Sequence, residues 1–312
     1  MIGAALRRGQ DASGGWGQQA GGVPTTEATA LALLALASGA GVKDASARAA
    51  LAWLNARQHP DGSWPATDQV STPSWMTVDA LLVFSLLGIE EERRRRAARW
   101  LLERRSAGST WITRLIERYH ELRDGEKQNV LDPSLVGWPW TSGAFGWVEP
   151  TATAVLALRA AAARDRSIAG DARYAERIRM GERLLVDRAV PGGGWNAGNV
   201  RVLGADLDPY PDTTAWALLA LRDPSGRPIP GAAAVANAGL DRLDRMLRST
   251  RSMLAHALAA ITFRAYGRDD AFPLAVLKAR ALDRAAVWVD NRSRALALLA
   301  LGAGSRSIGG LT

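Results

Sequence analysis

Three acidic residues stand at equivalent places in the sequence, each where a polar stretch runs into an Ala- and Leu-rich segment. They are Glu27, Glu149 and Asp212, and each precedes a matching leucine (Leu36, Leu158 and Leu221) by nine residues. A spacing that recurs in this way indicates an internal repeat. Carboxyl groups that converge on one buried place can do acid–base chemistry, because burial and neighbouring negative charge hold a carboxyl protonated. The pattern therefore makes all three acids candidate site residues.

The same acids also suit the starts of helices. Asp is a favoured N-cap residue, as Asp212 would be, and Pro150, which follows Glu149, is of a type preferred at the first helical position. The sequence leaves both interpretations open. Both interpretations predict that a helix begins at each acid.

Apolar and amphipathic segments alternate along the chain, and no strand pattern interrupts them. The segments expected to be apolar on all sides are 27–37, 75–87, 150–163, 212–221, 252–266 and 291–301, and those with one polar face are 2–8, 44–57, 91–105, 172–188, 232–248 and 272–284. Because a helix that is apolar all round belongs inside and one with a polar face belongs outside, the alternation predicts an all-α protein. We expect an α6/α6 toroid in which inner helices are wrapped by outer ones, with residues 1–312 forming one domain.

Turns that read Gln, three residues, Gly, one residue, Trp follow two of the amphipathic segments. The stretches 10–16 and 58–64 match this pattern fully, and those that end at Trp111 and Trp195 match it in part. The longest irregular stretch is 111–146, where we expect a helix over 112–122 and then a loop over one mouth of the ring. Long loops of this kind are usually functional or mobile.

These turns and the helix alternation resemble the terpenoid-cyclase and prenyltransferase superfamily, in particular the repeats of squalene-hopene and oxidosqualene cyclases. The resemblance covers nearly the whole chain and implies a structural role for the Gln and Trp of each turn. Class II cyclases of this family carry Asp-x-Asp-Asp-Thr-Ala, whose middle Asp protonates an alkene or epoxide. Aligned on Thr214 and Ala215, this chain keeps the middle acid as Asp212 and replaces its acidic neighbours with Tyr210 and Thr213.

The resemblance implies that Asp212 is the general acid, with Glu149 or Asp208 assisting it. Aromatic faces attract carbocations, so tryptophans outside the turns suit the wall of an apolar pocket. Trp216 is the foremost of these, because it follows Asp212 by four positions and shares its helix face. The expected pocket residues are Trp216, Tyr210, Trp75, Trp138, Trp140, Trp147 and Glu27.

The composition limits cofactors and partners. With no Cys and three His, the metal set of the zinc prenyltransferases is excluded, and the Asp-rich magnesium motif of class I synthases is missing, so we expect no metal and no cofactor. The net charge of +8 comes from arginines that alternate with acids, without a nucleic-acid-binding motif. We therefore expect an isoprenoid or other apolar small molecule as ligand, and no nucleic acid.

The location follows from the same features. The absence of Cys suits a reducing compartment, and no segment has the length and apolar character of a signal or a membrane span. We expect a cytoplasmic protein, with peripheral contact at the inner face of the membrane left open. The oligomeric state is also open.

Three functions remain on sequence alone. The first is a class II-like terpene cyclase that starts carbocation cyclisation of an isoprenoid by protonation. The second is a non-catalytic isoprenoid- or lipid-binding toroid. The third is a carbohydrate-active α6/α6 enzyme that uses two of the three acids as acid and base. A closed apolar chamber favours the first two, an open polar groove favours the third, and only turnover separates the first from the second.

Overall fold

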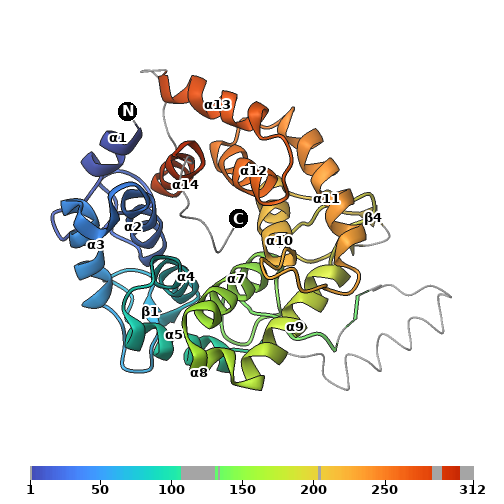
Figure 1. Cartoon of the computed structure of the whole chain (residues 1–312), viewed down its shortest axis with the longest axis horizontal. Coiled ribbons are helices and arrows are strands. Elements are labelled where there is room, and N and C mark those ends of the chain that lie inside the picture. The colour runs from blue at the N-terminus through green and yellow to red at the C-terminus, as the bar shows by residue number, and fades with distance from the viewer. Residues whose placement is uncertain (1, 107–130, 133, 203–204, 283–289, 303–312) are drawn as a thin grey trace.

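Two concentric layers of helices form a ring (Figure 1). The computed structural model describes residues 2–106, 131–132, 134–202, 205–282 and 290–302. The inner helices are α2 (Thr26–Ala40), α4 (Thr77–Leu87), α7 (Val148–Arg164), α10 (Pro211–Leu221), α12 (Met253–Ala265) and α14 (Asn291–Leu301). Each packs against the next, and α14 packs against α2, which closes the ring. The prediction of an all-α toroid is confirmed.

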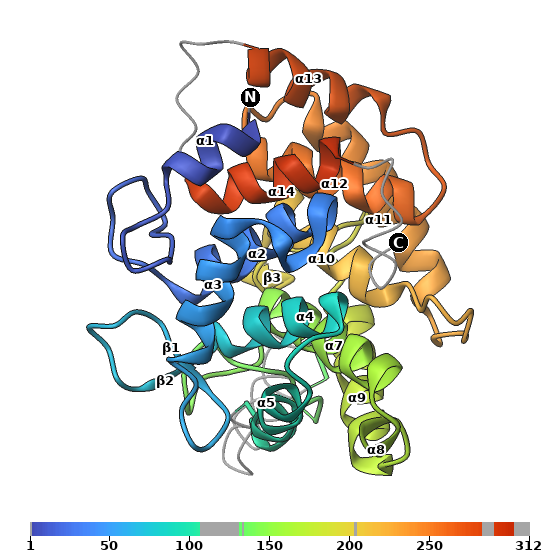
Figure 2. The ribbon, with the colours of Figure 1, turned by 60° about the vertical axis from the view of Figure 1, so that its left-hand side comes forward.

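The outer layer follows the amphipathic segments. Its helices are α1 (Ile2–Arg8), α3 (Ala45–Asn55), α5 (Glu91–Glu103), α9 (Ala172–Asp187), α11 (Ala232–Leu247) and α13 (Ala271–Leu282). Figure 2 shows α1 and α3 outside α14 and α2. Burial explains the division: every residue of α4 from Thr77 to Ser85 is buried, whereas α9 buries only one face, with Ile178 and Leu185 on it.

Four tryptophans each hydrogen-bond to an outer and an inner helix. Each of these tryptophans, with its two hydrogen bonds, is called a clamp below, and its threonine partner the clamp threonine. The backbone N–H of each donates to a threonine hydroxyl near the start of the next inner helix, in the pairs Trp16–Thr29 (2.9 Å), Trp64–Thr77 (2.8 Å), Trp138–Thr151 (3.0 Å) and Trp195–Thr214 (2.9 Å). Each indole N–H donates to a backbone carbonyl of the preceding outer helix, at Leu6, Leu54, Leu101 and Leu185. Both N–H donors of each tryptophan are thus satisfied inside the wall.

Glycine is required two residues before three of these tryptophans. Gly14, Gly62 and Gly193 share a φ of 96°, in the left-handed half of the map that side chains disfavour. A Cβ at any of them would also collide with a backbone carbonyl of the next outer helix. The turn therefore lies directly against that helix because no side chain separates them.

The third clamp differs from the sequence-based expectation. Trp138 makes its contacts, whereas Trp111, which the turn pattern indicated, lies outside the described residues. In the first two turns a glutamine amide bridges to the next outer helix, as Gln58 does with the carbonyls of Gly62 (3.0 Å) and Arg93 (2.9 Å). The third turn uses Arg177 of α9 instead.

Arg177 is 2% exposed and donates to three backbone carbonyls around Trp138. Its acceptors are Val136 (2.8 Å), Arg104 (2.9 Å) and Gly137 (3.1 Å). The guanidinium also stacks on the Trp138 ring, 3.7 Å from its centroid. Burial lowers the pKa of Arg177 to about 10, so the group stays charged at neutral pH. One side chain therefore joins α9, the end of α5 and the third turn.

Replacing Arg177 should destabilise the ring. We expect Arg177→Met to lower the free energy of unfolding by about 3 kcal/mol, because the carbonyls of Val136, Arg104 and Gly137 lose the guanidinium donor. Urea unfolding followed by circular dichroism measures this. Arg179→Met, on the exposed side of the same helix, is the matched control and should change stability by less than about 0.5 kcal/mol. Equal effects of the two variants would contradict the assigned role of Arg177.

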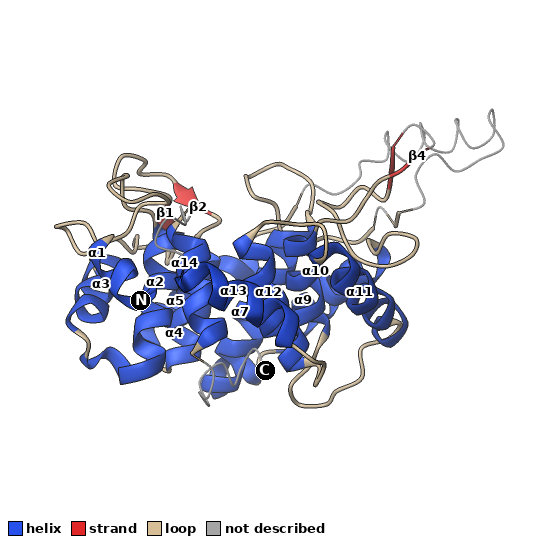
Figure 3. Cartoon of the chain, turned by 90° about the horizontal axis from the view of Figure 1, so that it is seen from above, coloured by secondary structure: helices blue, strands red, loops and turns tan. Residues whose placement is uncertain are grey.

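The described parts of the loops that lead from an outer helix into the next inner helix gather on one side of the ring, which we call the loop face (Figure 3). Two small hairpins lie there, although no strand pattern was found in the sequence: β1 (Trp64–Pro65) pairs with β2 (Pro73–Ser74), and β3 (Arg201–Val202) with β4 (Ala205–Asp206). The inner helices consequently all point their N-termini toward the loop face. Among the described residues, no helix has both the length and the apolar character needed to span a bilayer.

Candidate active site

Two of the predicted acids meet at the loop-face end of the ring. Glu27 and Glu149 occupy the first turns of α2 and α7, and Arg292 of α14 lies between them. Its Nη2 donates to Oε1 of Glu149 at 2.7 Å, and its Nε forms an ion pair with Oε1 of Glu27 at 3.1 Å. The Glu27 side chain is 6% exposed and that of Arg292 is 19% exposed. These ion pairs are therefore largely shielded from solvent.

A third acid, Asp79, completes this group from the first turn of α4. The residue is buried, and its Oδ2 has no hydrogen-bond partner among the described residues. Burial raises the pKa of Asp79 well above its usual value; the negative charge of Glu27 raises it further, as does that of Glu149, while Arg292 opposes them. Such surroundings favour a protonated carboxyl. The four residues Glu27, Asp79, Glu149 and Arg292 are called the acid cluster below.

The closure of the ring holds the acid cluster in place. The backbone N–H of Asn291 donates to the carbonyl of Gln18 at 2.7 Å, and its side-chain amide donates to the carbonyl of Gly17 at 3.0 Å. The Gln18 amide in turn donates to Oε2 of Glu27 at 2.6 Å. The loop after the first tryptophan clamp thus fixes both the start of α14 and one carboxylate.

The sequence-based reasoning missed Asp79 and Arg292. Asp79 does not stand at the repeated acid position. Two residues before the clamp threonine Thr77 the chain has Trp75, where three other inner helices have Glu27, Glu149 and Asp212. One signal was available: Asp79 is the only charged residue between positions 75 and 87. A lone charge in an otherwise apolar helix is costly to bury and points to a function.

The acids predicted around Asp212 lie apart from the cluster. Asp212 is the second residue of α10 and partly buried; the N-cap position belongs to Tyr210, whose side chain makes no capping bond, so the N-cap interpretation of Asp212 is wrong. No ion pair in the described ranges joins it to the acid cluster. The Asp208 side chain is 91% exposed and pairs with Arg242 at 3.1 Å. Tyr210 is 52% exposed, so it and Asp208 lie on the surface.

The predicted pocket tryptophans occupy three environments. Trp75 and Trp138 border a cavity of about 10 Å³ that Val78 and Pro150 also line, although Trp138 chiefly serves as the third clamp. Trp140 and Trp147 stack with ring centroids 5.6 Å apart, in the loop before α7. Trp216 lies on the inner face of the ring.

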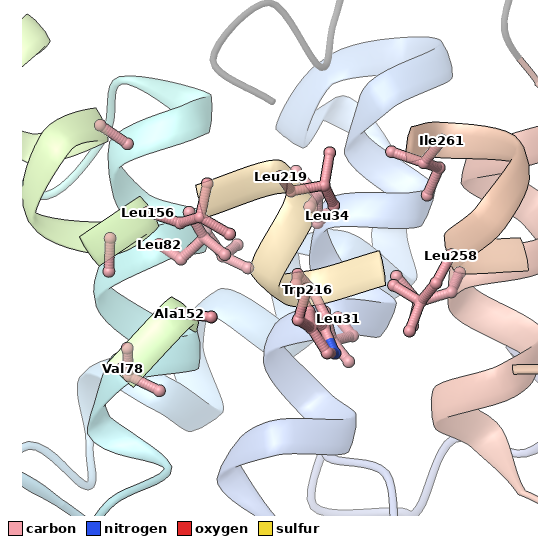
Figure 4. Close-up of a cluster of buried hydrophobic side chains, with 14 of the residues drawn as sticks. Leu31, Leu34, Val78, Leu82, Ala152, Leu156, Trp216, Leu219, Leu258 and Ile261 are labelled. Carbon is pink, nitrogen blue, oxygen red and sulfur yellow. The ribbon is translucent and has the colours of Figure 1, made fainter. Parts of the chain in front are cut away.

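That inner face is apolar. Figure 4 shows buried side chains from five inner helices in one cluster, and those labelled are Leu31, Leu34, Val78, Leu82, Ala152, Leu156, Trp216, Leu219, Leu258 and Ile261. An apolar wall of this kind, with ionisable groups at one end, suits an apolar ligand better than a polar one. Within the described residues, no group of three or more His, Cys, Asp or Glu has an arrangement that could hold a metal ion.

The sequence matches no family model and no curated protein. Solved structures that resemble the chain include a protein from Actinoplanes, with a TM-score of 0.52 and 18% identity over 97% of this chain and 99% of that one. The type II terpene cyclase MstE from Scytonema has a TM-score of 0.45 and 18% identity over 77% of this chain. Salmonella alpha-2-macroglobulin gives 0.46 and 13%, with 97% of this chain and 17% of that one covered.

The Actinoplanes protein shares the all-α fold along almost its full length, and at 18% identity the likeness concerns the fold alone. The match with the Scytonema cyclase spans 61% of that protein. A variant of the same cyclase, in complex with geranylgeranyl dihydroxybenzoate, has a TM-score of 0.45 and 16% identity.

Proposed function

We propose that the chain is an acid-initiated isoprenoid cyclase in which Asp79 donates the first proton. The burial of Asp79 beside Glu27 and Glu149 carries this proposal. A carboxylic acid can protonate a substrate at neutral pH only if its surroundings keep it neutral until the substrate arrives. Asp79 has such surroundings, and an apolar wall adjoins the acid cluster.

The proposed reaction is an isomerisation. The Asp79 O–H proton goes to one carbon of a substrate double bond, whose π electrons form the new C–H bond and leave a cation on the other carbon. A second double bond attacks that cation and closes a ring, and transfer of a proton from a neighbouring carbon to a water molecule ends the sequence. The solvent then returns one proton to the Asp79 carboxylate, so the proton released and the proton consumed cancel, and atoms and charge balance without a co-reactant.

The surrounding residues support these steps in different ways. Arg292 places a positive charge near the carboxylate that Asp79 becomes after donation, which limits the cost of forming it. The leucines of the inner face exclude water, which would quench a cation. The face of Trp216 can stabilise a cation by about 1–2 kcal/mol when desolvated.

Exposed apolar side chains support entry of such a substrate at the loop face. The large hydrophobic residues most exposed in the described ranges are Val23, Val70, Phe145, Leu207 and Tyr210. All five lie in loops that lead into inner helices, at the end of the ring where the acid cluster lies. Isoprenoids partition into bilayers, so peripheral contact of this face with a membrane forms part of the proposal.

Turnover in deuterium oxide tests the proposal. The purified protein is incubated with squalene, epoxidised squalene, geranylgeranyl and farnesyl diphosphates and prenylated quinols, and the extracts are analysed by mass spectrometry. We expect a cyclic product isomeric with its substrate that gains one deuterium from the initiating acid. Asp79→Asn and Asp212→Asn distinguish the structural candidate from the one that the family resemblance implies.

Each possible result of the turnover experiment leads to a different conclusion. Loss of product in Asp79→Asn alone supports Asp79 as the acid, and loss in Asp212→Asn alone transfers that role to Asp212. Isoprenoid that co-purifies without any product would replace the cyclase by a binding protein. A cyclic product without deuterium would refute initiation by protonation.

A further inference from the structure

A groove of about 420 Å³ opens beside α14, where the ring closes. The outer helices α1 and α13 both pack against α14, and Figure 1 shows them on its outer side. Ile2, Leu298 and Leu301 give the groove apolar walls, and the small residues Gly3 and Ala281 leave it open. Its volume falls in the range of about 300–1,000 Å³ that is usual for small-molecule sites.

The groove is remote from the acid cluster. Leu301 follows Arg292 by nine residues on α14, which is about 13 Å along a helix axis. The acid cluster lies at the loop-face end of the ring, whereas Leu301 is the last residue of α14, at the opposite end. A ligand in the groove therefore occupies a site separate from the proposed active site.

Lys278 of α13 is the charged residue in the lining of the groove. Its side chain is exposed, and no ion pair with another described residue engages it. A lysine in this position covers apolar surface with its methylene stem and keeps its ammonium group at the water boundary. Arg7, near Gly3, is already paired with Asp44 at 2.7 Å. Lys278 thus leaves one positive charge at the edge of an apolar groove that no acidic side chain lines.

Gly3 keeps the groove open, although the packing of α1 does not require a glycine there. A Cβ at this position would lie 3.5 Å from Nη1 of Arg7 and 3.7 Å from Cδ2 of Leu298, which are ordinary contact distances. Alanine also favours a helix more than glycine does. A larger side chain would point at Leu298, on the facing wall, and fill the groove. One substitution can therefore close the site without a clash with the backbone.

We propose that the groove binds a free fatty acid, whose alkyl chain lies along Leu298 and Leu301 and whose carboxylate pairs with the ammonium group of Lys278. One cation and no acid match a ligand with a single negative charge, and apolar walls match an unbranched chain. A charged head group that stays at the water boundary avoids the cost of burial. This inference goes beyond the proposed function, because neither the acid cluster nor a reaction takes part in it.

Two ligands with the same chain separate the contribution of the charge from that of the groove. Dodecanoate carries the carboxylate, and 1-dodecanol carries a hydroxyl in its place. Equilibrium dialysis with mass-spectrometric detection, at concentrations below micelle formation, gives both dissociation constants. We expect the wild-type protein to bind dodecanoate about tenfold more tightly than dodecanol, because an ionised acceptor makes the stronger hydrogen bond to an ammonium group.

Variants of Lys278 assign that preference to one charge. Lys278→Met keeps the apolar stem without the ammonium group, so the ratio of the two affinities should fall to about one. Lys278→Arg keeps the charge and should keep the preference for dodecanoate. Arg179→Met removes a positive charge from α9, on the far side of the ring (Figure 1), and should leave the ratio as in the wild type.

Variants of Gly3 assign the binding to the groove. Gly3→Leu should weaken the binding of both ligands at least about tenfold, because its side chain takes the place of the alkyl chain. It should unfold at the wild-type temperature or above, so that a loss of binding is not a loss of fold. Gly3→Ala adds only the Cβ and should keep both affinities within about twofold.

The binding is independent of catalysis. Asp79→Asn should bind dodecanoate as tightly as the wild type does. Fatty-acid binding without turnover of any isoprenoid would leave this inference standing and refute the cyclase. Turnover of an isoprenoid without fatty-acid binding would do the reverse.

Three results would overturn the inference. They are binding of neither ligand by the wild-type protein, equal wild-type affinities for the two, and affinities that Gly3→Leu leaves unchanged, which would locate the fatty acid elsewhere on the protein. Sedimentation velocity tests the other occupant of such a groove. Self-association that Gly3→Leu abolishes, without fatty-acid binding, would assign the groove to a second copy of the chain.

Discussion

Asp79→Asn is expected to abolish cyclisation and, at the same time, to stabilise the protein at neutral and alkaline pH. The amide has nearly the same shape as the carboxyl, but it neither donates the initiating proton nor ionises. Removal of a general acid from a reaction that needs full protonation should lower turnover by at least about 10³-fold. The stabilisation has a separate cause in proton linkage.

The sign of that stabilisation follows from the raised pKa of Asp79. A carboxyl whose pKa is higher in the folded than in the unfolded state favours folding fully only below the unfolded pKa. Its contribution is lost as the pH rises from there through the folded pKa. In that window the wild-type protein loses up to about 1.4 kcal/mol per pH unit, whereas Asp79→Asn does not.

Urea unfolding of both proteins between pH 4 and pH 9 checks this expectation, with the variant gaining relative stability as the pH rises. Asp244→Asn is the matched control, because Asp244 lies half-exposed on the outer helix α11, and this variant should show no such gain in relative stability. If Asp79→Asn is less stable than the wild type by the same amount at every pH, Asp79 is ionised in the folded protein and stabilises the fold.

Arg292→Met should produce the largest loss of stability, and that loss should depend on pH. Arg292 is the ion-pair partner of both Glu27 and Glu149, and the negative charges of these two residues hold its pKa above its usual value. Without it, buried carboxylates face one another unpaired. Breaking a buried ion pair in this way costs about 3–5 kcal/mol.

Acid should reverse the effect, because protonation of the orphaned carboxyls removes their repulsion. We expect the stability deficit of Arg292→Met to be greatest at neutral pH and to shrink toward pH 4. The triple variant Arg292→Met, Glu27→Gln, Glu149→Gln should recover most of the lost stability at pH 7. If the deficit is the same at every pH and the triple variant fails to recover, the role of Arg292 is packing and not charge compensation.

The helices of both layers were predictable from sequence. Local patterning decides whether a segment is apolar all round, like 75–87, or has one polar face, like 172–188, and burial follows from that property without knowledge of neighbours. The clamps at Trp16 and Trp64 were predictable for the same reason, since the clamp tryptophan lies ten residues after the carbonyl that its indole contacts, at Leu6 and Leu54. Short-range spacing carries all of this information.

The third clamp and the acid cluster depended on the tertiary structure. Trp138 contacts the carbonyl of Leu101, 37 residues earlier, because an insertion separates the turn from its helix and breaks the spacing that pointed to Trp111. Arg292 meets Glu149 across 143 residues of sequence. Their side chains share one place only because α14 packs against α2 and closes the ring.

The sequence alone therefore determined which helices are inner and which are outer, and that acids stand at the starts of some inner helices. Only the closed ring decided which of those acids lie together, and that Asp79, outside the repeated position, lies among them. The physical reason is that a raised pKa or a compensated charge depends on burial and on groups within a few ångströms. Both are set by packing between distant segments and not by spacing along the chain.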